Sequence, residues 1–86
     1  MKLNENFITH ENAGKTVLVC LDSALFSGLV RLNGSALFIV ECLREEITAD
    51  ELLQKMMARY DGSPEAMRLG IDKALDTLRE IGALDE

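Results

Sequence analysis

Residues 36–43, Ala-Leu-Phe-Ile-Val-Glu-Cys-Leu, are apolar on nearly every side and carry one charge, Glu41. Asn33, a residue type that caps helix N termini, precedes them, so the segment predicts a helix running to about Arg44. A helix that is apolar all round is stable only when other elements cover it. A chain of 86 residues is one small domain, so we expect this helix in the middle of its core.

Three strand-like segments precede this helix. Residues 16–21, Thr-Val-Leu-Val-Cys-Leu, are β-branched and apolar, and they predict the strongest strand. Residues 6–10 predict a weaker strand, and the turn-forming residues 12–15 between the two segments predict a hairpin. A short third strand is predicted over Leu29–Leu32, and it leads directly into Asn33.

A second helix is marked by its start signals. Thr48 and Glu51 form a T-x-x-E capping box, while Ile47 and Leu52 occupy the positions of a hydrophobic staple. Apolar residues then recur at helical spacing up to Tyr60. The sequence therefore predicts a helix that begins after Thr48 and ends near residue 60.

A third helix begins at Ser63-Pro64, a capping residue followed by proline at the first helical position. Gly82 is typical of the residue just past a helix end. One face of the helix carries Met67, Ile71, Ala74, Leu75, Leu78 and Ile81. The order of three strands and three helices predicts an α+β fold, with a three-stranded antiparallel sheet and helices on one of its faces.

Charge is unevenly distributed along the chain. The formal net charge is −6, and residues 41–86 hold 6 basic and 12 acidic side chains. This excess of acid argues against a nucleic-acid partner. The chain has no apolar run long enough to span a bilayer, and residues 1–14 lack the apolar core of a signal peptide. We therefore expect a cytoplasmic protein.

No residue pattern predicts catalysis or a bound metal. His10 is the only histidine and has no cysteine or serine at motif spacing. Cys20 and Cys42 lie in apolar segments and are expected to be free, buried thiols. No phosphate-binding glycine motif is present. We expect a protein that is not an enzyme and needs no cofactor.

The strand Leu29–Leu32 allows two interpretations. A three-stranded sheet has two open edges with unpaired N–H and C=O groups, and this strand could lie at one of them beside a helix. Such an edge can take up a peptide as an added strand. Alternatively, the shortness of the strand and the charge of Arg31 simply protect the edge. Met56, Met57 and Met67 could line a peptide-binding surface, although core packing is favoured for them.

A series of segments, taken in order, resembles the PqqD-like family, the pyrroloquinoline quinone synthesis protein D group of peptide-recognition domains. The segments are Phe7-Ile8-Thr9-His10-Glu11, Phe26-Ser27-Gly28-Leu29-Val30-Arg31-Leu32-Asn33, Phe38-Ile39 with Glu41, Thr48-Ala49-Asp50-Glu51-Leu52-Leu53, Tyr60-Asp61 and Leu78-Arg79-Glu80-Ile81-Gly82-Ala83-Leu84. The resemblance extends over almost the whole chain, so residues 1–86 are expected to form one domain of this kind.

The resemblance implies a winged helix-turn-helix-like domain without catalytic activity. Such a domain binds the leader segment of a ribosomally synthesised precursor peptide and presents it to a modifying enzyme, often a radical S-adenosylmethionine (radical SAM) enzyme. The leader becomes an extra strand beside the third strand, in a groove shared with the third helix.

Carried onto this chain, the resemblance implies two sets of peptide-binding residues. The strand would supply Leu29, Val30, Arg31 and Leu32, and the helix wall would include residues among Arg68, Ile71, Asp72 and Leu75. Proline at position 30 removes one strand N–H, so we expect it to abolish leader binding. Helical spacing does not determine which flank of the third helix faces the guest.

The chain departs from the family pattern at five positions, of which the two in the third helix are expected near the groove. Ser35 and Ala36 stand where the family often has Thr-Gly, and Val40 stands where it often has Trp. Gly70 and Ala74 replace an Asp and a large apolar residue of the third helix. These departures imply a wider groove, a different leader or a lost peptide function.

Two other functions remain open at the level of the sequence. A winged helix that binds nucleic acid shares the implied topology, although the acidic C-terminal half opposes it. A homodimeric accessory module could use the open sheet edge for self-pairing.

Overall fold

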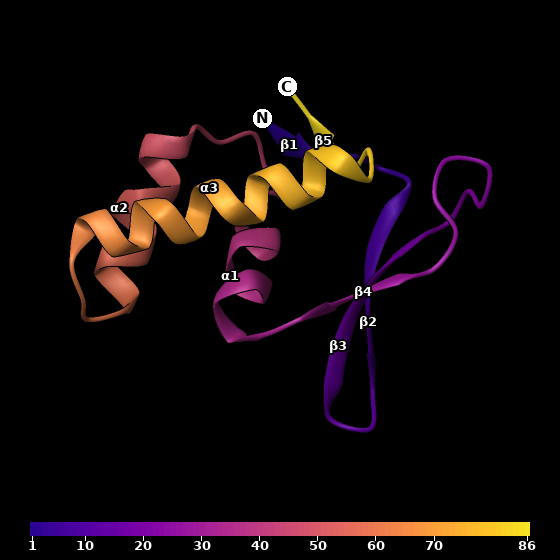
Figure 1. The fold of residues 1–86 in the computed structure, drawn as a ribbon, viewed down its shortest axis with the longest axis horizontal. Coiled ribbons are helices and arrows are strands. Elements are labelled where there is room, and N and C mark those ends of the chain that lie inside the picture. The colour runs from indigo at the N-terminus through magenta and orange to yellow at the C-terminus, as the bar shows by residue number, and fades with distance from the viewer.

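The computed structural model describes all 86 residues, Met1–Glu86. Figure 1 shows its elements in chain order: β1 (Lys2–Leu3), β2 (Phe7–Asn12), β3 (Lys15–Cys20), β4 (Leu29–Leu32), α1 (Gly34–Cys42), α2 (Ala49–Arg59), α3 (Pro64–Glu80) and β5 (Leu84–Asp85). The predicted α+β fold, with a three-stranded antiparallel sheet followed by three helices, is confirmed. The short strands β1 and β5 were not predicted.

The main sheet has the strand order β2-β3-β4, and both of its pairs are antiparallel. Ala13 and Gly14, with φ of 55° and 77°, join β2 to β3. Positive φ at both turn residues is the two-residue hairpin geometry that matches strand twist. The hairpin projects from the helical layer like a wing (Figure 1). The order leaves β4 at one edge of the sheet and β2 at the other.

The three helices begin at the residues that the sequence predicts. The side-chain oxygen of Asn33 accepts a hydrogen bond from the Ala36 N–H at 2.9 Å. The capping box at α2 is complete, with Glu51 N–H donating to Thr48 Oγ1 at 3.1 Å and Thr48 N–H donating to Glu51 Oε1 at 3.0 Å. Ser63 caps α3 through the Ala66 N–H. These local bonds fix where each helix enters the core.

The core draws on β2, β3 and all three helices. Its buried residues are Phe7, Leu18, Ile39, Val40, Leu43, Ile47, Leu52, Met56, Ile71, Leu75, Leu78 and Ala83. Helix α1 is covered less completely than its composition predicts, because Leu37 and Phe38 are only half-buried. The Phe38 ring meets the Tyr60 ring edge-on at 5.6 Å, and the Arg59 guanidinium lies 5.5 Å from the Phe38 ring centroid.

The pair of β1 and β5 closes the domain at the ends of the described chain. Leu3 lies opposite Leu84 in this pair. The Leu3 N–H donates to the Leu43 carbonyl at 2.8 Å, and the Asn4 N–H donates to the Ala83 carbonyl at 2.7 Å. Two-residue strands show no alternation of polar and apolar residues, so only tertiary contacts define them.

Three of the four arginines in the helical half form ion pairs. Arg44 pairs with Glu41, Arg68 with Asp50 and Asp72, and Arg79 with Asp76 and Glu86. Cys20 and Cys42 are free thiols, as predicted, and both are half-buried. None of the three helices has both the length and the apolar character that crossing a bilayer requires.

Candidate peptide-binding groove

The outer edge of β4 is open because this strand pairs with β3 alone. The hydrogen bonds between β2 and β3 show which residues of β3 bond toward β2 and which bond toward β4, and hence which backbone groups of β4 face the open edge. The Leu21 N–H donates to the Asn6 carbonyl at 2.6 Å, so odd-numbered residues of β3 bond toward β2. Even-numbered residues of β3 therefore bond toward β4.

The register of β3 and β4 then assigns each amide of β4. Val30 lies opposite Leu18 and Leu32 lies opposite Thr16, so Val30 and Leu32 exchange hydrogen bonds with β3. Leu29 and Arg31 alternate with them and direct their N–H and C=O groups outward. The expectation that the Val30 N–H would meet a guest strand is thus wrong, because that amide already pairs within the sheet.

Side chains of β4 alternate between the two faces of the sheet. Val30 and Leu32 are half-buried and pack against the core, whereas Leu29 is 61% exposed and Arg31 is exposed. Leu29 and Arg31 thus direct their backbone N–H and C=O groups toward the open edge and their side chains toward the face of the sheet away from the core. A strand added at this edge would therefore meet both the backbone groups and the exposed side chains of these two residues.

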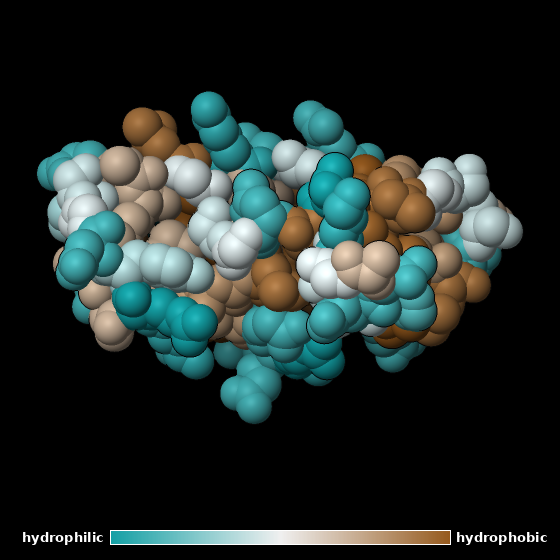
Figure 2. Space-filling model, turned by 90° about the horizontal axis from the view of Figure 1, so that it is seen from below, coloured by the Kyte–Doolittle hydropathy of each residue, from teal (hydrophilic) through white to brown (hydrophobic).

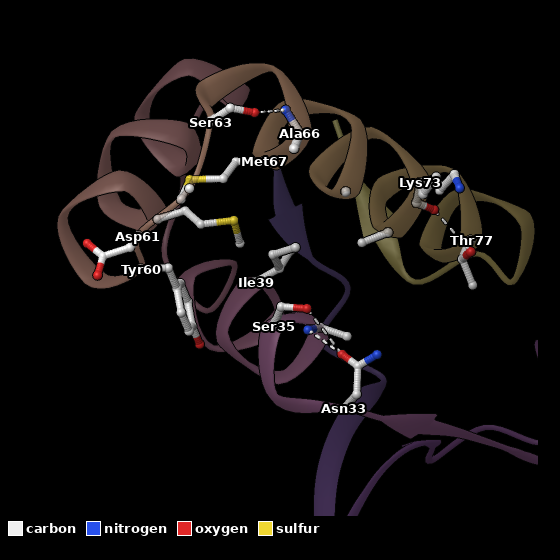
Figure 3. Close-up of a pocket in the computed structure, with 15 residues that line it drawn as sticks. Asn33, Ser35, Ile39, Tyr60, Asp61, Ser63, Ala66, Met67, Lys73 and Thr77 are labelled. Carbon is white, nitrogen blue, oxygen red and sulfur yellow. Dashed lines mark hydrogen bonds between the residues drawn. The ribbon is translucent and has the colours of Figure 1, made fainter.

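A groove of about 540 Å³ opens where β4 ends. Figure 3 shows it between the first turns of α1, the end of α2 and one flank of α3. Its lining residues are Asn33, Ser35, Ala36, Ile39, Met56, Tyr60, Asp61, Gly62, Ser63, Ala66, Met67, Gly70, Lys73, Ala74 and Thr77. The residues Leu29–Leu32 do not line the hollow, but Asn33, which directly follows the strand, does.

The structure places the four expected wall residues of α3 away from this groove. Ile71 and Leu75 are 0% and 2% exposed and belong to the core. Arg68 donates to Asp50 of α2 at 2.8 Å and lies 3.6 Å from Asp72, on another flank of the helix. In this structure the groove is formed by a different flank of α3, which includes Ala66, Gly70, Lys73, Ala74 and Thr77.

Four of the five departures from the family pattern meet in this groove. Ser35 and Ala36 line it from α1, and Gly70 and Ala74 line it from α3. The fifth, Val40, is buried in the core. These positions were therefore the best signal in the sequence for the flank of α3 that lines this groove, because they lie together although helical spacing could not select them.

The floor of the groove is apolar and open. A Cβ atom added to Gly70 would meet no heavy atom within 4 Å, so internal packing does not require glycine there. Met67 and Met56 border the same hollow, and their flexible side chains can adapt to a guest. Figure 2 shows apolar surface exposed between hydrophilic side chains on the face that is turned downward in Figure 1.

Comparison with known proteins gives a family and a fold. The family model described as "Coenzyme PQQ synthesis protein D (PqqD)" matches residues 15–84. The solved structure "TbiB1 in Complex with the TbiA(beta) Leader Peptide" superposes with a TM-score of 0.81 at 18% sequence identity, covering 99% of this chain and 95% of that one. No curated protein sequence matches the chain. The structural likeness shows a shared fold, and since the family model spans most of the sequence, the chain belongs to the PqqD family.

Proposed function

We propose that this protein binds the leader segment of a ribosomally synthesised precursor peptide and presents it to a modifying enzyme. The observation that carries the proposal is the open edge of β4, which leads into an apolar groove between α1 and α3. An edge strand beside an apolar helix face is a common site for peptide capture. Membership of the PqqD family supports this, as does the leader peptide in the complex of the structurally similar TbiB1.

In the proposed complex, all four residues of β4 contribute to binding. The backbone groups of Leu29 and Arg31 pair with the guest strand, and the side chains of Val30 and Leu32 pack beneath it. Beyond Leu32 the guest continues past Asn33 into the groove, where its side chains contact Gly70 and Ala74. Arg68, Ile71, Asp72 and Leu75 then act indirectly, because their contacts hold α3 in place.

The protein supplies binding and positioning in this proposal, and the chemistry belongs to its partner. The family resemblance implies a radical SAM enzyme as that partner. We place the encounter in the cytoplasm, where a precursor peptide is made. The two free thiols support a reducing compartment.

The decisive experiment is an amide chemical-shift titration with synthetic leader segments of candidate precursor peptides. We expect the largest shifts at Leu29 and Arg31 and along the groove flank of α3, from Ala66 to Thr77. Shifts confined to other surfaces, or none with any leader, would contradict the proposal.

A matched pair of variants separates backbone pairing from side-chain contact. Arg31→Pro and Arg31→Ala both remove the guanidinium, but only proline removes the outward N–H. We expect Arg31→Pro to weaken leader binding well beyond Arg31→Ala, with the fold of both variants checked by circular dichroism. Equal affinities of the two variants would contradict strand addition at this edge.

A further inference from the structure

Two cations beside the proposed binding path have no carboxylate partner. Of the five arginines, Arg44, Arg68 and Arg79 form ion pairs, and Arg59 lies over the Phe38 ring. Arg31 makes no ion pair, and neither does Lys73 in the wall of the groove. Lys2, Lys15 and Lys55 form no ion pair either, but Arg31 lies on the edge strand and Lys73 lines the groove, so these two unpaired cations are the ones beside the proposed binding path.

The position of Arg31 determines what its side chain can meet. Arg31 lies at a non-hydrogen-bonded position relative to β3, opposite Val17, with its own amide directed to the open edge. A guest residue paired with Arg31 would place its side chain on the same outer face of the sheet, about 5 Å away between Cβ atoms. The guest residues on either side of it would point inward, toward Val30, Leu32 and the helices.

Lys73 gives the groove a charge polarity. It lines the hollow next to Thr77, while Asp61, the acidic residue of the lining, lies at the opposite end beside Tyr60 (Figure 3). Exposed charges are largely screened beyond about 8 Å at physiological ionic strength. A guest passing Arg31 and Lys73 therefore responds to these two cations more than to the net charge of −6.

We infer that the guest is an acidic peptide that combines carboxylate side chains with apolar ones. This inference rests on the proposed strand addition and defines the chemical class of the leader. Along β4, a carboxylate on the outer face of the sheet pairs with Arg31, and the guest residues on either side of it are apolar, since successive side chains of a strand point to opposite faces of the sheet. Past Asn33, within the groove, a second carboxylate meets Lys73 and an apolar side chain occupies the open space over Gly70.

A selection experiment tests the inference without knowledge of the natural precursor. The intact protein is immobilised, and a phage-displayed library of random 12-residue peptides is selected against it. We expect the recovered peptides to be rich in Asp and Glu, with large apolar residues next to the acid that pairs with Arg31. Synthetic copies should bind less tightly as the salt concentration rises.

Charge-reversal variants link the preference to the two cations. Arg31→Glu and Lys73→Glu should each weaken binding of the selected peptides by about fivefold or more, since opposite charges become like charges. Lys55→Glu is the matched control, because Lys55 is a helical lysine without an ion pair outside the groove, and it should leave the affinity unchanged. Selection on the Arg31→Glu variant should yield peptides with Lys or Arg in place of the acids.

The outcomes distinguish this inference from the function on which it rests. The recovered peptides could be neutral or basic and bind the Arg31→Ala variant but not the Arg31→Pro variant. That result would overturn the inference of an acidic guest while supporting strand addition at β4. Equal losses in Lys55→Glu and Lys73→Glu would also overturn it. A selection that yields no peptide dependent on the β4 edge would contradict both proposals.

Discussion

Leu18 and Val30 lie opposite each other in the antiparallel pair of β3 and β4, at a position where both residues exchange backbone hydrogen bonds. Leu18 is fully buried, so this pair ties the edge strand to the core. The amide of Val30 is therefore structural, and the neighbouring amide of Arg31 is the one available to a guest.

Proline substitutions at these neighbouring positions should have different effects on stability. Val30→Pro removes a hydrogen bond within the sheet and leaves the Leu18 carbonyl unpaired, so we expect the free energy of unfolding to fall by about 1–3 kcal/mol. Arg31→Pro removes only an outward N–H, which edge strands tolerate, and should cost less. Urea unfolding of both variants measures the difference. A larger loss of unfolding free energy in Arg31→Pro than in Val30→Pro would mean that the Arg31 N–H, and not the Val30 N–H, bonds to β3.

Gly70→Ala should stabilise the free protein while impairing its binding. Glycine within a helix costs about 1 kcal/mol relative to alanine, and the added methyl group meets no neighbour. Gly70→Leu should fill the hollow and weaken guest binding more strongly than Gly70→Ala. Thermal unfolding without peptide and affinity for a selected peptide are the two measurements. Unchanged affinity in Gly70→Leu would exclude this part of the groove from the binding path.

Thr48→Ala should destabilise the protein by about 1 kcal/mol, because it removes the acceptor for the Glu51 N–H in the capping box of α2. Thr77→Ala provides the matched control. Its hydroxyl donates to the Lys73 carbonyl within α3, a bond that contributes little to helix stability. Urea unfolding should show a lower midpoint for Thr48→Ala alone. A comparable loss in both variants would indicate that the cap has no special role.

Burial raises the pKa of the Cys42 thiol above its ordinary value of 9.0. The thiolate is thus disfavoured in the fold, and the stability gained from the neutral thiol is present below the unfolded-state pKa and lost as the pH rises through the folded-state pKa. The difference in unfolding free energy between the wild type and Cys42→Ala should therefore decrease above about pH 9. Urea unfolding from pH 7 to 10 tests this, and a constant difference would contradict it.

Local signals in the sequence account for most of the fold. Asn33, Thr48 and Ser63 each cap a helix through a side-chain oxygen, and such bonds depend only on residues three positions away. The strand Leu29–Leu32 is found at its predicted bounds. The pair of β1 and β5 could not be predicted, because two residues have no periodicity and their partners lie at opposite ends of the sequence.

The candidate site was harder to predict than the fold for a physical reason. The family resemblance implied Ile71 and Leu75 as wall residues, but both lie on the apolar stripe of α3 and are buried in the core, where a guest does not reach them. The groove flank consists of small and polar residues such as Gly70 and Thr77, which resemble any exposed helix surface in the sequence. Only the packing of α1 against α3 reveals that these residues line a hollow.

The pairing of β1 with β5 sets an order of events during synthesis. Residues 2–3 are translated well before their partners at positions 84–85. Ala83, which is fully buried, and most of the groove wall on α3 are also late in the chain. Contacts between such distant residues form slowly. A nascent chain therefore has no complete groove until α3 and the residues that follow it have been translated.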